Sequence, residues 1–452
     1  MQKKIAFSLS SISLGIFYGL LAYMPLHIFI STVIGANIGG LAVMKVLKDV
    51  VMMFGFCSIL IYSVRQSWFK DWLKNKLVIA VLLYGLLTVV LALVRPTDLD
   101  AEILGVTYNL RFLVFLLYAW LLVKAFPKRN ILETSIWIVL VTGVAVSLFG
   151  VIQYVVLPDN ALTHLGFVRS NGVLPAFFID DKPDLERVMS TLRDPNSLGS
   201  YLIILASLTV AARANFSKKS RKMWLGVGML TLLCLLLTFS RSALLGLCVA
   251  IVVGIVLVGK DRVRLSRKQI RLGLLAVAAL AVIGIGSLAA FRNSYVVQNV
   301  IFHADQSTTL EDPNELRIRF IRESIDGVIA DPLGSGPGTA GLASIRNNVQ
   351  GTQLNENYYL QIATEVGILG LILFMTILVL TAVALYKARK NNPFAIALLA
   401  SFAGLALTNV LVHIWSNETV AYTWWGLAGL LTGGQHFTTT KKTKSYIIRE
   451  HS

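Results

Sequence analysis

The chain consists largely of apolar runs of roughly 20 residues, separated by short polar segments that are rich in Lys and Arg. A run of this length can cross the ~30 Å hydrocarbon core of a bilayer as a helix. Outer-membrane strands would instead alternate in polarity over roughly ten residues. The pattern therefore predicts an all-α polytopic membrane protein with about twelve transmembrane helices, at residues 5–23, 47–64, 77–94, 103–123, 131–157, 197–212, 223–239, 243–258, 272–291, 358–386, 395–414 and 420–431.

Basic clusters follow every second predicted helix, and cytoplasmic loops of membrane proteins collect Lys and Arg. This bias predicts a single integral-membrane domain over 1–452 with both termini in the cytoplasm. Two large external loops are predicted, at 158–195 and at 292–357, the second with short helices. Residues 435–452 form a basic cytoplasmic tail.

Two apolar segments allow more than one interpretation. Residues 28–44 are also apolar, but a span there would turn every later basic loop outward. We interpret the segment as the external approach to the second helix, either re-entrant or interfacial. The run 5–23 is long and lacks a small-residue cleavage site, so we expect a retained helix rather than a signal peptide.

Composition excludes a soluble protein, since 56% of the residues are hydrophobic and the mean hydropathy is +0.70. The net charge of +17 would suggest nucleic acid as a partner of a soluble chain. Here cytoplasmic loops account for it, and no nucleic-acid partner is expected. The three cysteines lie in apolar runs without metal-ligand spacing, so no metal site and no cofactor is predicted.

Arginine is unusually frequent in the predicted external segments, where the cytoplasmic charge bias does not explain it. Guanidinium groups bind phosphate with two parallel hydrogen bonds, so these arginines indicate an anionic ligand. The alternative is that they pair with acids of the same loops. Arg241 joins two apolar runs with no acid nearby, and Arg111 lies inside the run 103–123. Charges at such depth are costly and usually functional, although Arg241 could also extend its charge to the interface.

The polar interval 312–370 combines cations, a rigid turn and an acid at the edge of a predicted span. Arg317, Arg319 and Arg322 fall within two helical turns. A Pro/Gly-rich turn follows at 331–338, and Glu356 immediately precedes the apolar run. Together these features indicate a site for an anionic, polar group that is carried on a lipid.

Four short blocks, in order, resemble motifs of one known family. They are Arg187-Val188-Met189-Ser190-Thr191-Leu192-Arg193-Asp194-Pro195-Asn196, the turn Ser240-Arg241-Ser242, Arg317 before Pro332-Leu333-Gly334-Ser335-Gly336, and Glu356-Asn357 before Gly367-Ile368-Leu369-Gly370. The chain thus resembles the O-antigen ligase and Wzy-type polysaccharide polymerase superfamily. The resemblance implies a multi-span, GT-C-like glycosyltransferase at the outer face of the plasma membrane.

The resemblance also implies the substrates and partners. The donor would be an undecaprenyl-pyrophosphate-linked oligosaccharide and the acceptor a glycan or lipid-glycan, with membrane lipids and other polysaccharide-assembly membrane proteins as partners. Ligases that attach O-antigen to lipid A-core carry a histidine where this chain has Glu356. We therefore favour a polymerase of O-antigen or similar repeat units, with a ligase as the alternative. A transporter of lipid-linked sugars is a further alternative. Transporters are usually built from internal repeats, and this sequence shows no repeat between its halves.

The mechanism that follows is metal-independent. Arg241 and Arg317 would stabilise the departing pyrophosphate, helped by the substrate-binding residues Arg187, Arg193, Arg319 and Arg322. Glu356 would be the general base, with His303 as a rival and an ordinary helix-terminal acid as the alternative. Asn196 and Asn357 would bind sugar or phosphate oxygens, or simply cap helices. The glycines of 334–338 could present N–H groups to an anion.

Overall fold

Every predicted apolar run within the described part of the chain forms a helix, because a backbone in hydrocarbon must satisfy its own hydrogen bonds. The computed structural model describes residues 2–179, 182–215, 220–261, 313–348, 353 and 355–434. The predicted span 272–291, His303, the tail 435–452 and the side chain of Arg317 lie outside what it describes.

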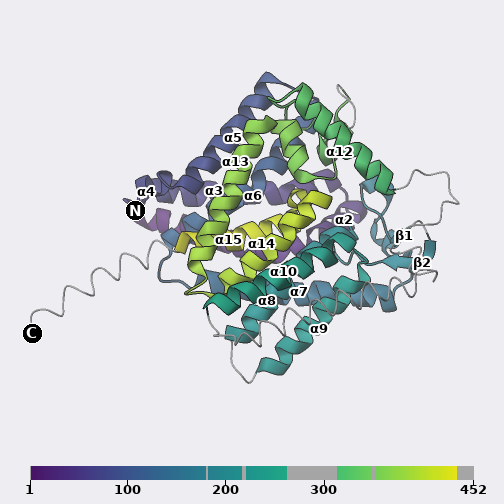
Figure 1. The fold of residues 1–452 in the computed structure, drawn as a ribbon. Coiled ribbons are helices and arrows are strands. Elements are labelled where there is room, and N and C mark those ends of the chain that lie inside the picture. The colour runs from purple at the N-terminus through teal and green to yellow at the C-terminus, as the bar shows by residue number, and fades with distance from the viewer. Residues whose placement is uncertain are drawn as a thin grey trace, which may run out of the picture.

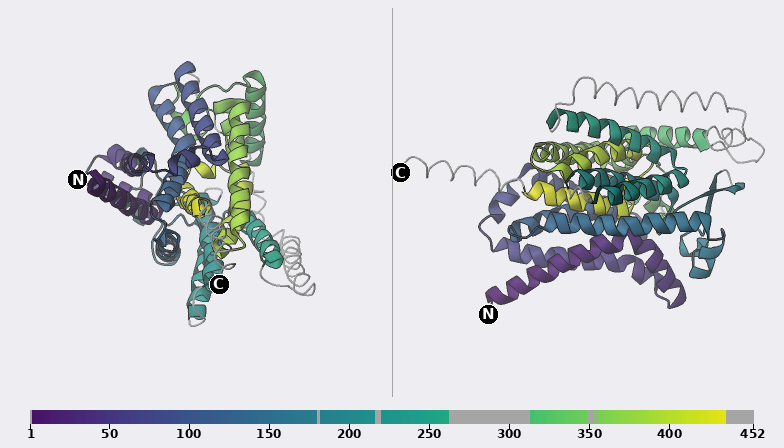
Figure 2. Two further views of the ribbon diagram at one scale, coloured as in Figure 1. Left: turned by 90° about the vertical axis from the view of Figure 1, so that its left-hand side faces the viewer. Right: turned by 90° about the horizontal axis from the view of Figure 1, so that it is seen from below.

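The first part of the chain forms antiparallel helices that end in a small hairpin (Figure 1). Its elements are α1 (Gln2–Tyr23), the 3-10 helix η1 (Met24–Leu26), α2 (His27–Asn37), α3 (Leu41–Val64), α4 (Phe69–Leu73), α5 (Lys76–Val94), α6 (Leu99–Ala125), α7 (Ile131–Val155), η2 (Ala161–Leu165), η3 (Arg169–Asn171), β1 (Phe177–Ile179) and β2 (Lys182–Arg187). The strands β1 and β2 pair antiparallel, with Phe177 opposite Arg187. Figures 1 and 2 show α4 at one end of the bundle and the hairpin at the other.

The second part completes the bundle. It comprises α8 (Pro195–Asn215), α9 (Arg221–Leu237), α10 (Arg241–Asp261), α12 (Pro313–Ala330), η6 (Gly341–Arg346), α13 (Tyr358–Ala388), α14 (Pro393–Leu411), η7 (Ile414–Ser416) and α15 (Glu418–Gly434). Helix α12 lies along α13 at the same end as the hairpin (Figures 1 and 2). The predicted span 395–414 was too long, since α14 ends at Leu411.

Eight helical stretches of the described residues are long and apolar enough to cross a membrane. One of them, Leu9–Asn37, combines α1 and α2. The helices α3, α9 and α15 coincide with further predicted spans but do not belong to these eight. The all-α polytopic class is thus confirmed, while the count of twelve and the cytoplasmic position of both termini stay predictions.

The core is centred on α15, which packs most extensively against α6. Residues 419–433 of α15 are all buried. Trp415, just before the helix, contacts Trp424 and Trp425, with ring centroids 5.5 Å away in both cases. Aromatic side chains bury large areas with fixed geometry, so this cluster anchors the last helix at the centre of the bundle.

The apolar segment 28–44 does not form a separate span. It folds as α2 and the start of α3, which pack against each other around the turn at Gly39 and Gly40. Ile28 of α2 packs with Leu162, Phe167, Val173 and Met189 in a small hydrophobic cluster under the loop 158–195. Helix α2 therefore supports that loop.

Helix α13 is broken at Gly367, whose φ of 77° is outside the helical range. The break leaves the carbonyls of Thr364 and Glu365 and the N–H of Ile368 without helical partners. The turn 332–336 provides them: Ser335 N–H donates to Thr364 O (2.8 Å), Gly336 N–H to Glu365 O (3.1 Å), and Ile368 N–H to Pro332 O (2.9 Å). The Pro/Gly-rich turn is thus packed into the break of α13.

A prediction concerns Gly105 of α6, where an added Cβ would fall on the backbone of Pro337 and Gly338. Because backbone cannot rotate away, we expect Gly105→Ala to lower the free energy of unfolding by about 1–3 kcal/mol. The control is Gly85→Ala on α5, whose Cβ would meet only Leu110 at 3.9 Å. That change should be neutral or slightly stabilising. Thermal unfolding in detergent measures both, and equal melting temperatures would contradict this packing.

Candidate functional site

The start of α8 is fixed by local sequence. Asp194 caps the helix, because its Oδ1 accepts from Ser197 N–H (2.9 Å) and its Oδ2 from the Ser197 hydroxyl (2.6 Å). Pro195 follows as the first helical residue, where its missing N–H costs nothing. Arg193 and Asn196 are thereby held on either side of a rigid helix start.

Asn196 joins two blocks that are 44 residues apart in sequence. Its Oδ1 accepts from Arg187 Nη2 (3.0 Å) and from the Ser240 hydroxyl (2.9 Å), and Arg187 Nε donates to Thr238 O (3.1 Å). Arg187 and Asn196 therefore join the end of β2 to the turn between α9 and α10 through hydrogen bonds. Burial lowers the pKa of Arg187, and nearby Arg241 acts in the same direction, whereas Asp194 opposes both.

Arg241 is the exposed guanidinium of this arrangement. It is the first residue of α10 and lies within electrostatic reach of Arg187. The turn before it contains Phe239 with a φ of 46°, a conformation that is rare outside glycine. This turn fixes the start of α10, where Arg241 lies.

Glu356 lies between two residues with structural roles. Asn357 is the N-cap of α13, since its Oδ1 accepts from Tyr359 N–H (2.9 Å) and Leu360 N–H (3.1 Å). The buried Asn355 donates to the Thr364 hydroxyl (3.2 Å). Glu356 itself is half-buried. Of the two roles predicted for Asn357, sugar or phosphate binding and helix capping, the contacts of its side-chain oxygen are those of a helix cap.

His413, between α14 and η7, connects Glu356 to the arginine side of the site. Burial lowers the pKa of His413, the carboxylates of Asp194 and Glu356 act in the opposite direction, and Arg193 lowers it further. All four side chains are thus close enough to interact. Lys45 of α3 adds a further cation, within electrostatic reach of Arg193. The fold brings together Arg187, Arg193, Asn196, Arg241 and Glu356.

The arginines of α12 are arranged differently. Arg319 lies 3.8 Å from Glu323 one turn along the helix, with half of its side chain exposed. Arg322 is exposed as well. Their substrate-binding role therefore stays a prediction from sequence, as does the catalytic role of Arg317.

The N–H groups of the glycine-rich turn bind a carboxyl group of the chain itself. Glu365 is fully buried in α13, and its Oε1 accepts from Gly338 N–H (3.0 Å) and Ala340 N–H (3.4 Å). Its Oε2 accepts from the Asn109 amide of α6 (2.7 Å). The N–H groups of Gly338 and Ala340 are therefore occupied by Glu365.

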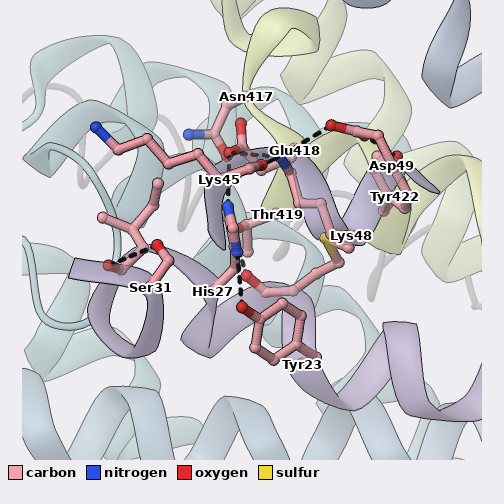
Figure 3. Close-up of polar contacts among 12 residues, drawn as sticks. Tyr23, His27, Ser31, Lys45, Lys48, Asp49, Asn417, Glu418, Thr419 and Tyr422 are labelled. Atoms are coloured by element: carbon pink, nitrogen blue, oxygen red, sulfur yellow. Dashed lines mark hydrogen bonds and ion pairs between the residues drawn. The ribbon is translucent and has the colours of Figure 1, made fainter. Parts of the chain in front are cut away.

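A buried charge cluster that sequence reasoning did not assemble lies beside this site (Figure 3). Glu418, the first residue of α15, lies 3.1 Å from Arg111, 3.6 Å from His27 and 3.9 Å from Lys48. The three partners come from α6, α2 and α3, and their side chains are at most 4% exposed. Arg111, singled out by sequence as a functional candidate, is instead the partner of this carboxylate.

A second acid, on α3, extends the cluster. Lys48 also pairs with Asp49 (3.1 Å), whose other oxygen accepts from the Tyr422 hydroxyl (2.8 Å; Figure 3). Buried charges persist only where they are paired, so this network fixes how α2, α3, α6 and α15 meet. The sequence signal was present, since charges inside apolar runs are rare, but the partners are too far apart in sequence to be matched.

Residues 226–375 match the family model described as O-antigen ligase. This part of the chain is similar to that family. The matched region extends from α9 into α13 and covers about a third of the chain. It confirms the resemblance that the four sequence blocks suggested. No curated protein matches the chain.

The matched region contains Arg241, Arg317 and Glu356, whereas Arg187, Arg193 and Asn196 precede it and His413 follows it. The match supports a membrane enzyme of the ligase or polymerase type, with a lipid-linked glycan donor and an acceptor. Within the described residues, no group of three or more His, Cys, Asp or Glu side chains could hold a metal ion.

Proposed function

We propose that the chain is a glycosyltransferase at the outer face of the plasma membrane, which polymerises O-antigen or similar repeat units without a metal ion. The donor is an undecaprenyl-pyrophosphate-linked oligosaccharide. The observation that supports this proposal is the convergence of an acid and fixed cations at one end of the bundle. Glu356 interacts with the same histidine as Arg193, and the Arg187–Asn196–Ser240 contacts hold the turn that carries Arg241.

The chemistry needs an acid–base group and a cationic one. A hydroxyl of the acceptor glycan attacks C1 of the donor sugar, while the bond from C1 to the pyrophosphate oxygen breaks and the pyrophosphate keeps the electron pair. Glu356 takes the hydroxyl proton. Arg193 and Arg241 oppose the negative charge that develops on the leaving group, and Arg317 is assigned the same role from sequence.

A ligase is the second candidate, because the matching family model is described as O-antigen ligase. It would use the same donor and leaving group and differ in its acceptor, lipid A-core or another glycan. Glu356 favours the polymerase, since a carboxylate stands where the ligases of the resemblance have histidine.

The deciding experiment uses the purified protein in detergent, the donor bearing a single repeat unit, and EDTA. Elongation of lipid-linked chains with donor alone, read by mass spectrometry, supports the polymerase. Transfer only after lipid A-core is supplied indicates the ligase. Absence of transfer to any acceptor, together with passage of the donor across a bilayer, would overturn the enzyme proposal in favour of a transporter.

Arg241→Ala tests the cationic half of the site. Removing one group that stabilises developing charge typically lowers kcat by about 10²–10³-fold, and we expect a loss of that size. The matched control is Arg213→Ala, an exposed arginine at the opposite end of α8. Steady-state rates of chain elongation measure both, and an equal loss in the two variants would mean that the effect of Arg241 is not local to the site.

A further inference from the structure

Helix α12 lies at the edge of the bundle, where α13 is its principal neighbour (Figures 1 and 2). One side of α12 packs inward, since Ser324 is buried and its hydroxyl donates to Phe320 O (2.6 Å). The remaining sides are exposed over much of the helix. A helix in an aqueous loop should present polar side chains on its exposed sides. Those of α12 are polar on one face only.

The other exposed face of α12 is apolar. Ile318, Ile325 and Ile329 are exposed, Ile329 to 72%. Because side chains at this spacing return to the same face of a helix, the three form one continuous isoleucine strip. Glu323 and Asp326 are exposed as well, and their positions fall on the neighbouring face, which is charged. Helix α12 therefore has a packed side, an isoleucine strip and a charged face.

The isoleucine strip continues onto the surface of a helix that can span a membrane. Leu333 follows Ile329 closely in sequence and is 71% exposed. The residue before it, Pro332, accepts a hydrogen bond from Ile368 N–H (2.9 Å), directly after the break of α13. Ile368 and Leu369 are themselves exposed, and α13 is long and apolar enough to cross a membrane. The apolar surface of α13 thus extends over Leu333 to the strip.

By length, the break of α13 falls where the hydrocarbon ends. Helix α13 has 31 residues, whereas about 20 cross the ~30 Å hydrocarbon core. About 20 residues counted back from the helix end at Ala388 reach the break at Gly367. The turn after α12 is bound at that break, and Asp331 forms an ion pair with Arg95 at the end of α5, another helix able to span a membrane. The carboxyl end of α12 is therefore held at the boundary between hydrocarbon and headgroups.

We propose that α12 is an interfacial helix: the isoleucine strip and Leu333 contact the hydrocarbon of the membrane, and the charged face is turned to headgroups and water. The strip is assigned to lipid because it joins a surface of α13 that lipid covers when that helix spans the membrane. Arg322 lies on the strip face between Ile318 and Ile325, and its long side chain can extend to the lipid phosphates. This inference does not depend on the proposed function.

Nitroxide labels on α12 measure this contact. Ile325→Cys, Ile329→Cys and, as the matched control on the charged face, Asp326→Cys are made in a chain whose three native cysteines are replaced by alanine. The labelled proteins are placed in nanodiscs of phosphatidylethanolamine and phosphatidylglycerol. Collisions of each label with oxygen, which concentrates in hydrocarbon, are compared with its collisions with a water-soluble nickel chelate. We expect the ratio of oxygen to nickel collisions to be several-fold higher at the two isoleucine positions than at the control.

Two results would overturn the inference. The same collision ratio at Ile325 and at Asp326 would mean that the strip faces water. Few collisions with either reagent at Ile325 and Ile329 would mean that protein covers the strip, either a second copy of the chain or residues 262–312, which lie outside the described part. A melting temperature equal to that of wild type verifies the fold of each labelled protein. The measurement needs no turnover, so failure of the proposed function would leave its result unchanged.

Discussion

Glu356→Gln is expected to lower kcat for glycosyl transfer by about 10²–10⁴-fold, the range typical of a lost general base. Glutamine keeps the size of the side chain and can still accept a hydrogen bond, but it cannot take the proton of the acceptor hydroxyl. Because positioning of the substrates is retained, KM should change little. Initial rates of chain elongation at saturating donor measure the effect.

The matched control is Glu323→Gln, the same substitution at an exposed acid of α12 that pairs with Arg319. We expect it to stay within twofold or so of wild type, as surface substitutions usually do. If Glu356→Gln retained the wild-type rate, Glu356 would be no more than an acid that complements the dipole of α13. The base would then have to be sought elsewhere at the site.

Glu365→Leu is expected to cost about 3–5 kcal/mol of the free energy of unfolding, a large share of a typical total of roughly 5–15 kcal/mol. The substitution leaves the N–H groups of Gly338 and Ala340 and the amide of Asn109 buried without an acceptor. Each unsatisfied group costs about 1–3 kcal/mol. Thermal and denaturant unfolding in detergent, together with the yield of extractable protein, measure the loss.

A charge exchange provides the control for this network. Asn109→Asp sets two carboxylates against each other, and Glu365→Gln sets two amide N–H groups against each other, so each single change should destabilise the protein. In the double variant the glutamine amide donates to the aspartate, while its oxygen still accepts from Gly338 and Ala340. Stability should recover, giving a coupling energy of about 0.5–3 kcal/mol. Purely additive losses would contradict the contacts assigned to Glu365.

These two predictions distinguish the roles of two acids, Glu365 and Glu356. Glu365 holds the Pro/Gly-rich turn against α6 and the break of α13, so its loss should first lower the stability of the fold. Glu356 lies nine residues before Glu365 in the sequence and is half-buried near His413, so its loss should first lower the rate of transfer. Measuring both properties for both variants tests that division.

The sequence by itself determined the helices and several of their ends. Runs of roughly 20 apolar residues must form helices in hydrocarbon whatever surrounds them. Local capping is equally self-contained: Asp194 with Pro195 starts α8, and Asn357 starts α13, through contacts within three residues. The blocks around Arg187, Arg241 and Glu356 were also recognisable, because each motif is short and continuous.

Only the tertiary structure decided which distant groups meet. Asn109 and Glu365 are 256 residues apart in sequence, and Arg111 and Glu418 are 307 apart. Their pairing depends on which helices are neighbours, and hydropathy does not encode this, since lipid and a neighbouring helix are equally apolar. For the same reason the sequence did not place His413 at the site, because the predicted span 395–414 included it. Only the end of α14 at Leu411 and the packing of the following loop against α8 and Glu356 bring its imidazole to the site.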